Sequence, residues 1–181
     1  MKQALLIIDV QNDYFTGGKS ELYNPLKALK NIEKILLHFR NQTLPVIHVQ
    51  HINVSACATF FQPDTEGVLI HKNLTPYENE YLVVKHAPNS FFETNLLDII
   101  KDNSITEIVI CGMMSHMCID TTTRACGDFG IKATLIDDAC TTKNLSWHGK
   151  TIHAEIVHDV FMASLDSVFA NVIKTDEFLS L

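Results

Sequence analysis

Three residues that lie far apart in the sequence could act together as a catalytic group. Asp9 follows the apolar run 4–8, Lys85 ends the run 81–85, and Cys118 comes shortly after the apolar run 107–111. A thiolate is a strong nucleophile, and a neighbouring carboxylate could accept the thiol proton. These residue types point to covalent catalysis on a small molecule, with Cys118 as the nucleophile and Asp9 as the general base.

The position of Cys118 favours a reactive thiol. Ser115 is the expected N-cap of a helix that runs to about Phe129, which puts Cys118 in the first turn. The helix dipole and an ammonium at Lys85 would both favour a thiolate there, so we expect the pKa of Cys118 to lie below the usual value of about 8.5. The competing interpretation is an inert buried thiol. The five cysteines contain no CxxC pair, which argues against a disulfide framework and a structural zinc site.

Alternating strands and helices can bring these residues to one place. Continuous apolar runs predict buried parallel strands over residues 4–8, 45–49, 81–85, 107–111, 131–136 and 168–173. Helical patterns are expected over residues 24–40, near 96–100, over 115–129 and over 148–165. This alternation predicts a parallel, doubly wound α/β sheet. If the strand order is 3-2-1-4-5-6, Asp9 and Cys118 end neighbouring strands at the carboxyl edge of the sheet, where ligands bind.

Composition limits the classes of function. The 181 residues, 46% of them hydrophobic and 19% charged, suit one globular domain spanning 1–181. A net charge of −7 argues against a nucleic-acid partner, and no apolar run approaches the roughly 20 residues that span a bilayer. We therefore expect a cytoplasmic protein without membrane contact, acting as a homo-oligomer on a small-molecule substrate. Residues 52–80 show no clear period, so they are expected to form a lid or an interface.

Four blocks of the sequence, in order, resemble the isochorismatase-like cysteine hydrolases of the nicotinamidase/isochorismatase superfamily. They are residues 5–15 (LLIIDVQNDYF), residues 84–85 with 91–96, residues 111–124 (CGMMSHMCIDTTTR) and residues 137–140 (DDAC). The resemblance covers nearly the whole chain. It implies a Rossmann-like three-layer α/β/α fold with a six-stranded, mostly parallel sheet, and a catalytic triad of Asp9, Lys85 and Cys118.

The resemblance also implies how the site would work. It implies a cis peptide bond between Met113 and Met114, and an oxyanion hole formed by the backbone N–H groups of Met114 and Cys118. Cys118 would then attack a carbonyl carbon, an amine would leave, and water would cleave the resulting thioester.

Two departures from the family narrow the prediction. Nicotinamidases of the family carry an Asp-x-His metal-binding motif where this chain has Gln50-His51-Ile52-Asn53, so we expect no metal and no other cofactor. Isochorismatases proper typically lack the nucleophilic cysteine, so Cys118 favours cleavage of a C–N amide-type bond. The alternatives are a vinyl-ether hydrolase of the isochorismatase type, a catalytically silent binding protein on the same fold, and a thiol redox sensor.

Further residues are candidates for the substrate pocket because each flanks a triad member or ends a strand. They are Gln11, Phe15, His51, Phe91 and His116. For each of them, packing or a surface position is an equally good interpretation. His148, His153 and His158 recur at a spacing of five, share no helical face, and are expected to be solvated.

Overall fold

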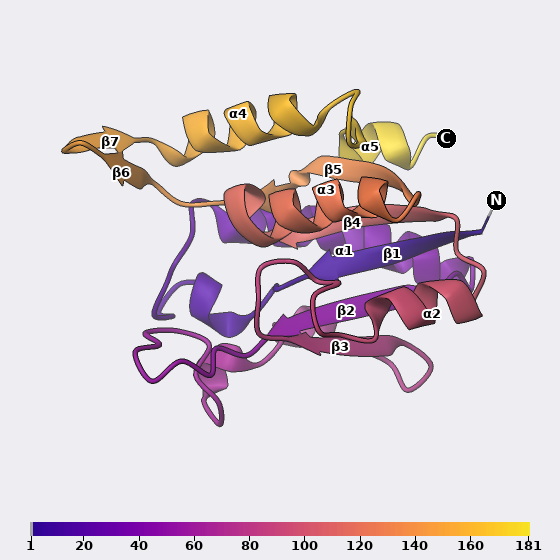
Figure 1. Cartoon of the computed structure of the whole chain (residues 1–181), viewed down its shortest axis with the longest axis horizontal. Helices are drawn as coiled ribbons and strands as arrows, with labels where there is room; N and C mark the ends of the chain where they lie inside the picture. Colours follow the sequence, from indigo (N-terminus) through magenta and orange to yellow (C-terminus); the bar gives the residue numbers. More distant parts are fainter. Residues whose placement is uncertain (1) are drawn as a thin grey trace.

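Six parallel strands form one sheet in the computed structural model, which describes residues 2–181. The sheet lies at the centre of the molecule (Figure 1). The strand order is β3-β2-β1-β4-β5-β8, which confirms the predicted order with β8 as the sixth strand of the sheet. The strands are β1 (Gln3–Ile8), β2 (Val46–His51), β3 (Tyr81–Lys85), β4 (Glu107–Met113), β5 (Lys132–Thr141) and β8 (Asn171–Ile173).

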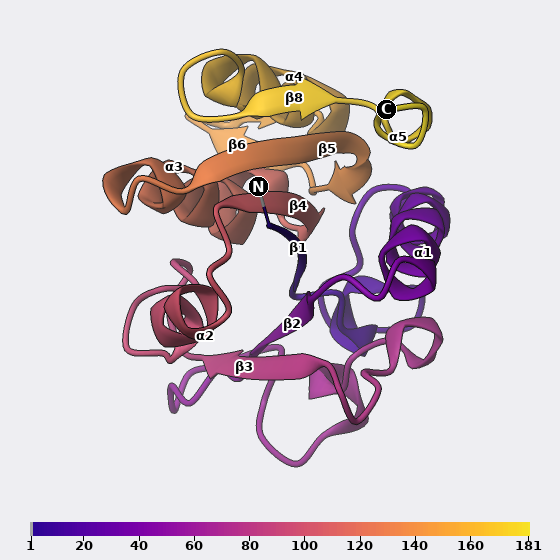
Figure 2. The same ribbon diagram turned by 90° about the vertical axis from the view of Figure 1, so that its right-hand side faces the viewer.

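Helices cover both faces of the sheet and complete the three layers (Figure 2). On one face, α1 (Pro25–Asn41) and α5 (Thr175–Phe178) pack over one half of the apolar core. On the other face, the core is closed by α2 (Leu96–Asp102), α3 (Asp120–Asp128) and α4 (Ala154–Leu165). The predicted Rossmann-like α/β/α fold is therefore confirmed. Within residues 2–181, no helix is both long and apolar enough to cross a bilayer.

A hairpin replaces the beginning of the last long helix predicted from the sequence. Strands β6 (Leu145–Trp147) and β7 (Lys150–Ile152) pair antiparallel and project from the body of the molecule (Figure 1). His148 and Gly149 join them with φ values of 47° and 75°. Two consecutive positive φ values are typical of the two-residue turns that favour hairpins. The helical prediction was wrong there, and α4 begins only at Ala154.

Residues 52–80 form a folded wall beside the carboxyl end of β1. Their backbone pairs with the chain that follows β1, since His71 N–H donates to the Val10 carbonyl and Asn12 N–H donates to the Leu69 carbonyl. The buried carboxylate of Asp13 accepts a 2.7 Å hydrogen bond from Phe61 N–H. The segment includes two short 3-10 helices, Glu66–Val68 and Lys72–Leu74.

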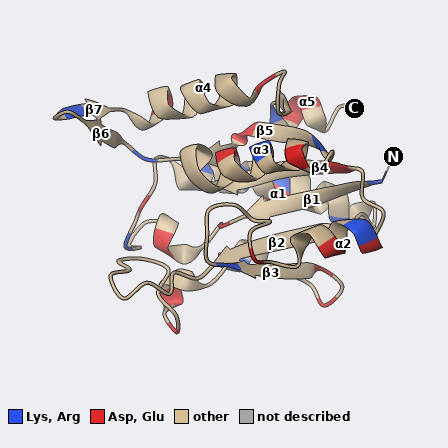
Figure 3. Cartoon of the chain, viewed as in Figure 1, with Lys and Arg blue, Asp and Glu red and all other residues tan. Residues whose placement is uncertain are grey.

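Charged residues of both signs are scattered over the outer elements in Figure 3.

A glycine lets β1 and β4 approach closely just below the site. Gly112 has φ 129° and pairs with Ile8 across the two strands. A Cβ atom at this position would lie 2.1 Å from the Ile8 carbonyl oxygen, far inside van der Waals contact. Only glycine therefore fits where β4 turns toward the segment that carries Cys118.

Candidate active site

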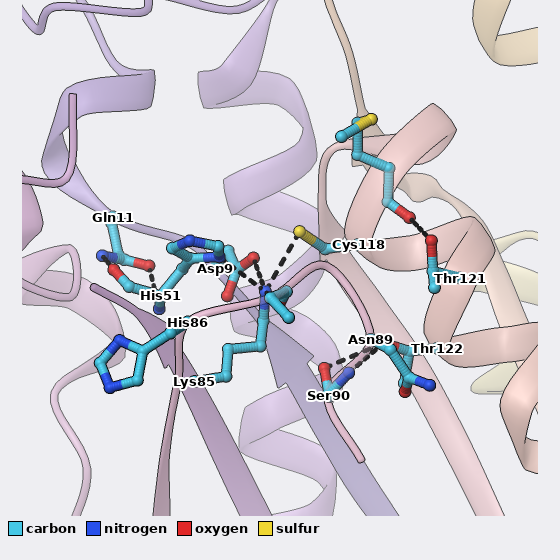
Figure 4. Close-up of polar contacts among 12 residues, drawn as sticks. Asp9, Gln11, His51, Lys85, His86, Asn89, Ser90, Cys118, Thr121 and Thr122 are labelled. Carbon is cyan, nitrogen blue, oxygen red and sulfur yellow. Dashed lines mark hydrogen bonds and ion pairs between the residues drawn. The ribbon is translucent and has the colours of Figure 1, made fainter. Parts of the chain in front are cut away.

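The structure brings Asp9, Lys85 and Cys118 together at the carboxyl edge of the sheet (Figure 4). Asp9 directly follows β1, Lys85 is the last residue of β3, and Cys118 lies in the turn after β4. Lys85 Nζ lies 2.8 Å from Asp9 Oδ2 and 3.1 Å from Cys118 Sγ. Asp9 and Lys85 are fully buried, and Cys118 is 5% exposed. The ammonium thus joins a carboxylate and a thiol that are more than a hundred residues apart in sequence.

The backbone of Asp9 adopts a conformation that is uncommon for a residue with a side chain. Its φ is 54°, in the left-handed region, and non-glycine residues held there cluster at functional sites. Two hydrogen bonds hold this bend: Asp9 N–H donates to the Val49 carbonyl, and Gln11 N–H donates to the Asp9 carbonyl. Among residues 2–181, the Oδ1 atom of Asp9 has no hydrogen-bond donor, so it can accept a proton.

Lys85 is surrounded by acceptors. Besides Asp9 and Cys118, its Nζ lies 3.0 Å from His51 Nδ1 and 3.0 Å from the Ala87 carbonyl. Burial alone would lower the pKa of Lys85, but the charge of Asp9 and the hydrogen bonds to Asp9 and Cys118 outweigh it and raise that pKa. Burial and the Lys85 charge together lower the pKa of His51 to about 4. The site therefore contains a charged lysine beside a neutral imidazole.

The expected lowering of the Cys118 pKa is wrong. Burial of the thiol, followed by the nearby charge of Asp9, raises its pKa, and the opposing effect of Lys85 does not compensate. The predicted α-helical first turn is also absent, because residues Ser115–Ile119 form a π-helical turn and α3 begins only at Asp120. The resting nucleophile is therefore a protonated thiol, which needs a base at the moment of attack.

The π-turn changes the hydrogen bonding of the Cys118 backbone. The Met114 carbonyl accepts from Met117 N–H at 3.0 Å and from Ile119 N–H at 3.3 Å. An α-helix would instead direct Cys118 N–H at this carbonyl, since it lies four residues on. Short π-turns of this kind are frequent at functional sites. The peptide bond between Met113 and Met114, at the start of the turn, is cis.

His51 contacts the triad directly, whereas Gln11 holds the backbone of His51. The buried Gln11 amide donates from Nε2 to the His51 carbonyl at 2.9 Å and accepts from His51 N–H at 2.8 Å (Figure 4). Its Nε2 also donates to the Val68 carbonyl at 2.6 Å. Because backbone groups use both ends of this amide, Gln11 fixes the position of His51 and the wall. His51 is half-buried beside Lys85.

The other pocket candidates contact residues outside the triad. Phe15 packs on the ring of His71 with centroids 4.4 Å apart, and Phe91 packs on Phe129 at 5.0 Å. The Nδ1 atom of His116 contacts the hydroxyl of Thr142. These contacts support packing roles for the three residues.

Two residues near the site had no clear signal in the sequence. Tyr14 is buried, and burial together with the charge of Asp9 raises its pKa, so its phenol stays neutral beside the triad. His158, expected to be solvated, instead lies 2.8 Å from the hydroxyl of Ser115, the first residue of the π-turn. The expected periodicity could not reveal this contact, because it depends on which face of α4 packs against the π-turn.

Comparison with known proteins identifies the family of the chain. The model of the isochorismatase domain matches residues 3–177 of the chain. The chain belongs to the isochorismatase family of hydrolases. It is 50% identical to the uncharacterized isochorismatase family protein YddQ of Bacillus subtilis, with 99% of each chain covered.

Solved structures of isochorismatase-type proteins share the fold. A crystal structure from Oleispira antarctica, described as an isochorismatase hydrolase, superposes with a TM-score of 0.95 at 42% identity, covering 99% of this chain and 97% of that one. The N-carbamoylsarcosine amidase of Thermoplasma acidophilum has a TM-score of 0.84 at 21% identity, covering 97% and 98%. The second likeness shows a shared fold.

The donor atoms of this isochorismatase-family site do not fit a metal ion. A carboxylate oxygen of Asp9, a ring nitrogen of His51 and the sulfur of Cys118 lie within 4.8 Å of one another, a spacing that ligands could adopt. However, Lys85 Nζ already lies between 2.8 and 3.1 Å from an atom of each. The ammonium therefore takes the position in which a cation would meet all three groups.

Proposed function

We propose that this isochorismatase-family hydrolase cleaves a C–N amide-type bond of a small molecule through a thioester on Cys118. One observation carries the proposal: a buried carboxylate, ammonium and thiol meet within 3.1 Å contacts at the edge of the sheet where ligands bind in this class of fold. The roles of Asp9, Lys85 and Cys118 follow from the chemistry of these groups.

Asp9 acts as the general base in the first step. Its carboxylate takes the proton of the Cys118 thiol as Sγ forms a bond to the carbonyl carbon of the substrate. The raised pKa of the thiol makes this base necessary. Lys85 stays protonated and stabilises the negative charge on whichever of its two neighbours carries it.

The oxyanion that forms on the substrate is stabilised by backbone N–H groups of Met114 and Cys118. The hydrogen bonds of the π-turn support this assignment, because the Met114 carbonyl accepts from Met117 N–H and Ile119 N–H and not from Cys118 N–H. One such donor typically contributes about 3–4 kcal/mol in the transition state.

Protonated Asp9 then returns the proton to the leaving nitrogen, and the C–N bond breaks. Water attacks the thioester while Asp9 takes one of its protons, and the C–S bond breaks. The proton goes back to sulfur, which regenerates the thiol and completes the net addition of water across the amide.

Amide chemistry is favoured over the alternatives by the site and by the fold's known range. Hydrolysis of a vinyl ether would need only an acid–base pair. A thiol held beside a carboxylate and an ammonium, as Cys118 is beside Asp9 and Lys85, is suited to acyl transfer. A protein named as an amidase shares the fold. A silent binding protein would have no need for a buried ion pair beside a thiol, since burying charges is costly.

The proposal is tested with the full chain on a panel of small carboxamides, carbamoyl and ureido compounds. Ammonia release and intact-protein mass are measured in parallel. Cys118→Ala should abolish both turnover and any acyl adduct, whereas Cys57→Ala, which removes the exposed cysteine, should change neither. Retained turnover in Cys118→Ala would overturn the mechanism.

A further inference from the structure

Three hydrogen-bonded side chains from different elements, Ser115, His158 and Asp137, form a polar chain that ends on the turn that carries Cys118. Ser115 Oγ lies 2.8 Å from His158 Nδ1, and His158 Nε2 lies 2.7 Å from Asp137 Oδ1. Ser115 begins the π-turn, His158 lies in α4, and Asp137 lies in β5. The chain therefore links the nucleophile segment to two neighbouring elements of the fold.

The chemistry of the three groups fixes the direction of their hydrogen bonds. A carboxylate only accepts, so the proton shared by His158 and Asp137 comes from Nε2. The His158 contact is the main cause of the lowered pKa of Asp137, so the carboxyl group is ionised. In a neutral His158, Nδ1 then accepts, and the hydroxyl of Ser115 must donate to it.

This serine, histidine and aspartate do not form a second nucleophilic centre. Ser115 is fully buried with its hydroxyl engaged by His158, and among residues 2–181 none of these three side chains has a hydrogen bond to Asp9, Lys85 or Cys118. The opposite end of the chain is accessible, because Asp137 and His158 line a cavity of about 310 Å³ together with residues of α1. The buried end faces the nucleophile turn, which suits a role in positioning.

We propose that His158 and Asp137 are positioning residues that hold Ser115, and with it the π-turn, so that Cys118 stays aligned with Lys85 and the substrate carbonyl. The proposal rests on the function proposed above. Ser115 begins the turn and is only three residues from Cys118, so the anchor at Ser115 would set the direction of both the Cys118 Sγ and its backbone N–H. Misplacement of a reacting group by about 1 Å can cost about 100-fold in rate.

The test compares His158→Ala with a control variant, His153→Ala, at the residue that precedes α4. His153 is exposed and has no side-chain contact with this chain of residues. On an amide that the wild type hydrolyses, His158→Ala should lower kcat by about 10- to 100-fold with KM within about twofold. His153→Ala should leave both unchanged. Added imidazole, which can enter the cavity beside residue 158, should restore much of the lost kcat.

A second measurement needs no substrate. Iodoacetamide labelling, resolved by peptide, should be altered by about threefold or more at Cys118 in His158→Ala, as expected when the alignment of a reacting group changes. Labelling of the exposed Cys57 should stay at the wild-type rate. Asp137→Asn, which keeps the side-chain volume, should change the labelling of Cys118 in the same way but by less, with Cys57 unchanged. This variant replaces His158→Ala in the test if His158→Ala does not fold. Ser115→Ala should match His158→Ala, and Ser115→Thr should recover activity.

These outcomes separate the two proposals. Wild-type kcat and wild-type Cys118 labelling in both the His158 and Asp137 variants would overturn the positioning role and leave the proposed hydrolysis intact. A wild-type protein that hydrolyses none of the amides would contradict the proposed function, while the labelling experiment would still report on the turn. A loss of kcat that imidazole fails to restore, with Cys118 labelling unchanged, would also overturn the positioning role.

Discussion

Lys85 Nζ lies 3.0 Å from His51 Nδ1, and this contact determines which ring nitrogen of the histidine carries hydrogen. An ammonium can only donate, so Nδ1 accepts and the hydrogen of the neutral ring must lie on Nε2. Burial and the Lys85 charge keep the ring neutral by lowering the pKa of His51 to about 4. His51 thus presents an N–H donor at the edge of the site.

The tautomer of His51 can be measured directly. In nitrogen-resolved NMR spectra, His51 should show the neutral Nε2–H form from about pH 5 to pH 8 and should titrate near pH 4, well below the usual value of about 6.5. Replacing Lys85 with Met should raise the His51 midpoint, because the repelling charge is gone. A midpoint near 6.5 in the wild type would contradict this account of the contact.

The pKa of Cys118 should respond in opposite directions to its two neighbours. Asp9→Asn removes a negative charge that opposes the thiolate, so iodoacetamide labelling of Cys118 should reach its half-maximal rate at a lower pH than in the wild type. Lys85→Met should move that midpoint upward. Both variants should lose turnover, and Cys57 labelling in the same samples provides the control. Equal midpoints in all three proteins would exclude the proposed coupling.

Gly112 should not tolerate a side chain. Gly112→Ala would put a Cβ atom 2.1 Å from the Ile8 carbonyl at a φ of 129°, so we expect a loss of about 3 kcal/mol or more in the free energy of unfolding. Gly127→Ala is the matched control, because that glycine lies in α3 with no atom within 4 Å of an added Cβ. There the change should stabilise the protein by up to about 1 kcal/mol. Urea titrations of both variants provide the comparison.

Glu80 should make the fold sensitive to acid. Its carboxylate accepts from Arg40 Nε at 2.7 Å and contacts His48 Nε2 at 2.9 Å, with its side chain only 4% exposed. Burial alone would raise the pKa of Glu80. The hydrogen bonds from Arg40, Tyr77 N–H and His48 have the larger effect and lower that pKa to about 2. Because the folded pKa lies below the unfolded one, this stability is present above about pH 4.5 and is lost as pH falls toward 2.

Glu80→Gln tests this contribution. We expect the substitution to cost about 2 kcal/mol of unfolding free energy at pH 7, and we expect the difference from wild type to shrink as the pH is lowered toward 2. Denaturant titrations at several pH values measure both effects. A difference that does not change with pH would show that the ionised form of Glu80 contributes nothing specific.

The sequence predicts the sheet and the meeting of the triad because both depend on strong local signals. Apolar runs locate the strands, and parallel strands place the residues after β1 and β4 at one edge. The direction of the Cys118 pKa could not be predicted, because it depends on how deeply the thiol is buried and how near Asp9 lies. The contact of His158 with Ser115 could not be predicted, because it depends on which face of α4 packs against the π-turn.

The reacting groups and the wall beside them belong to separate stretches of the chain. The triad lies at the ends of strands, whereas residues 52–80 are fastened to the short stretch 10–13 by backbone pairing and by the carboxylate of Asp13. Variation within the exposed part of that wall, such as residues 54–57, leaves these fastenings in place. A mutant library confined to this part of the wall would therefore leave the strand ends that carry the triad unchanged.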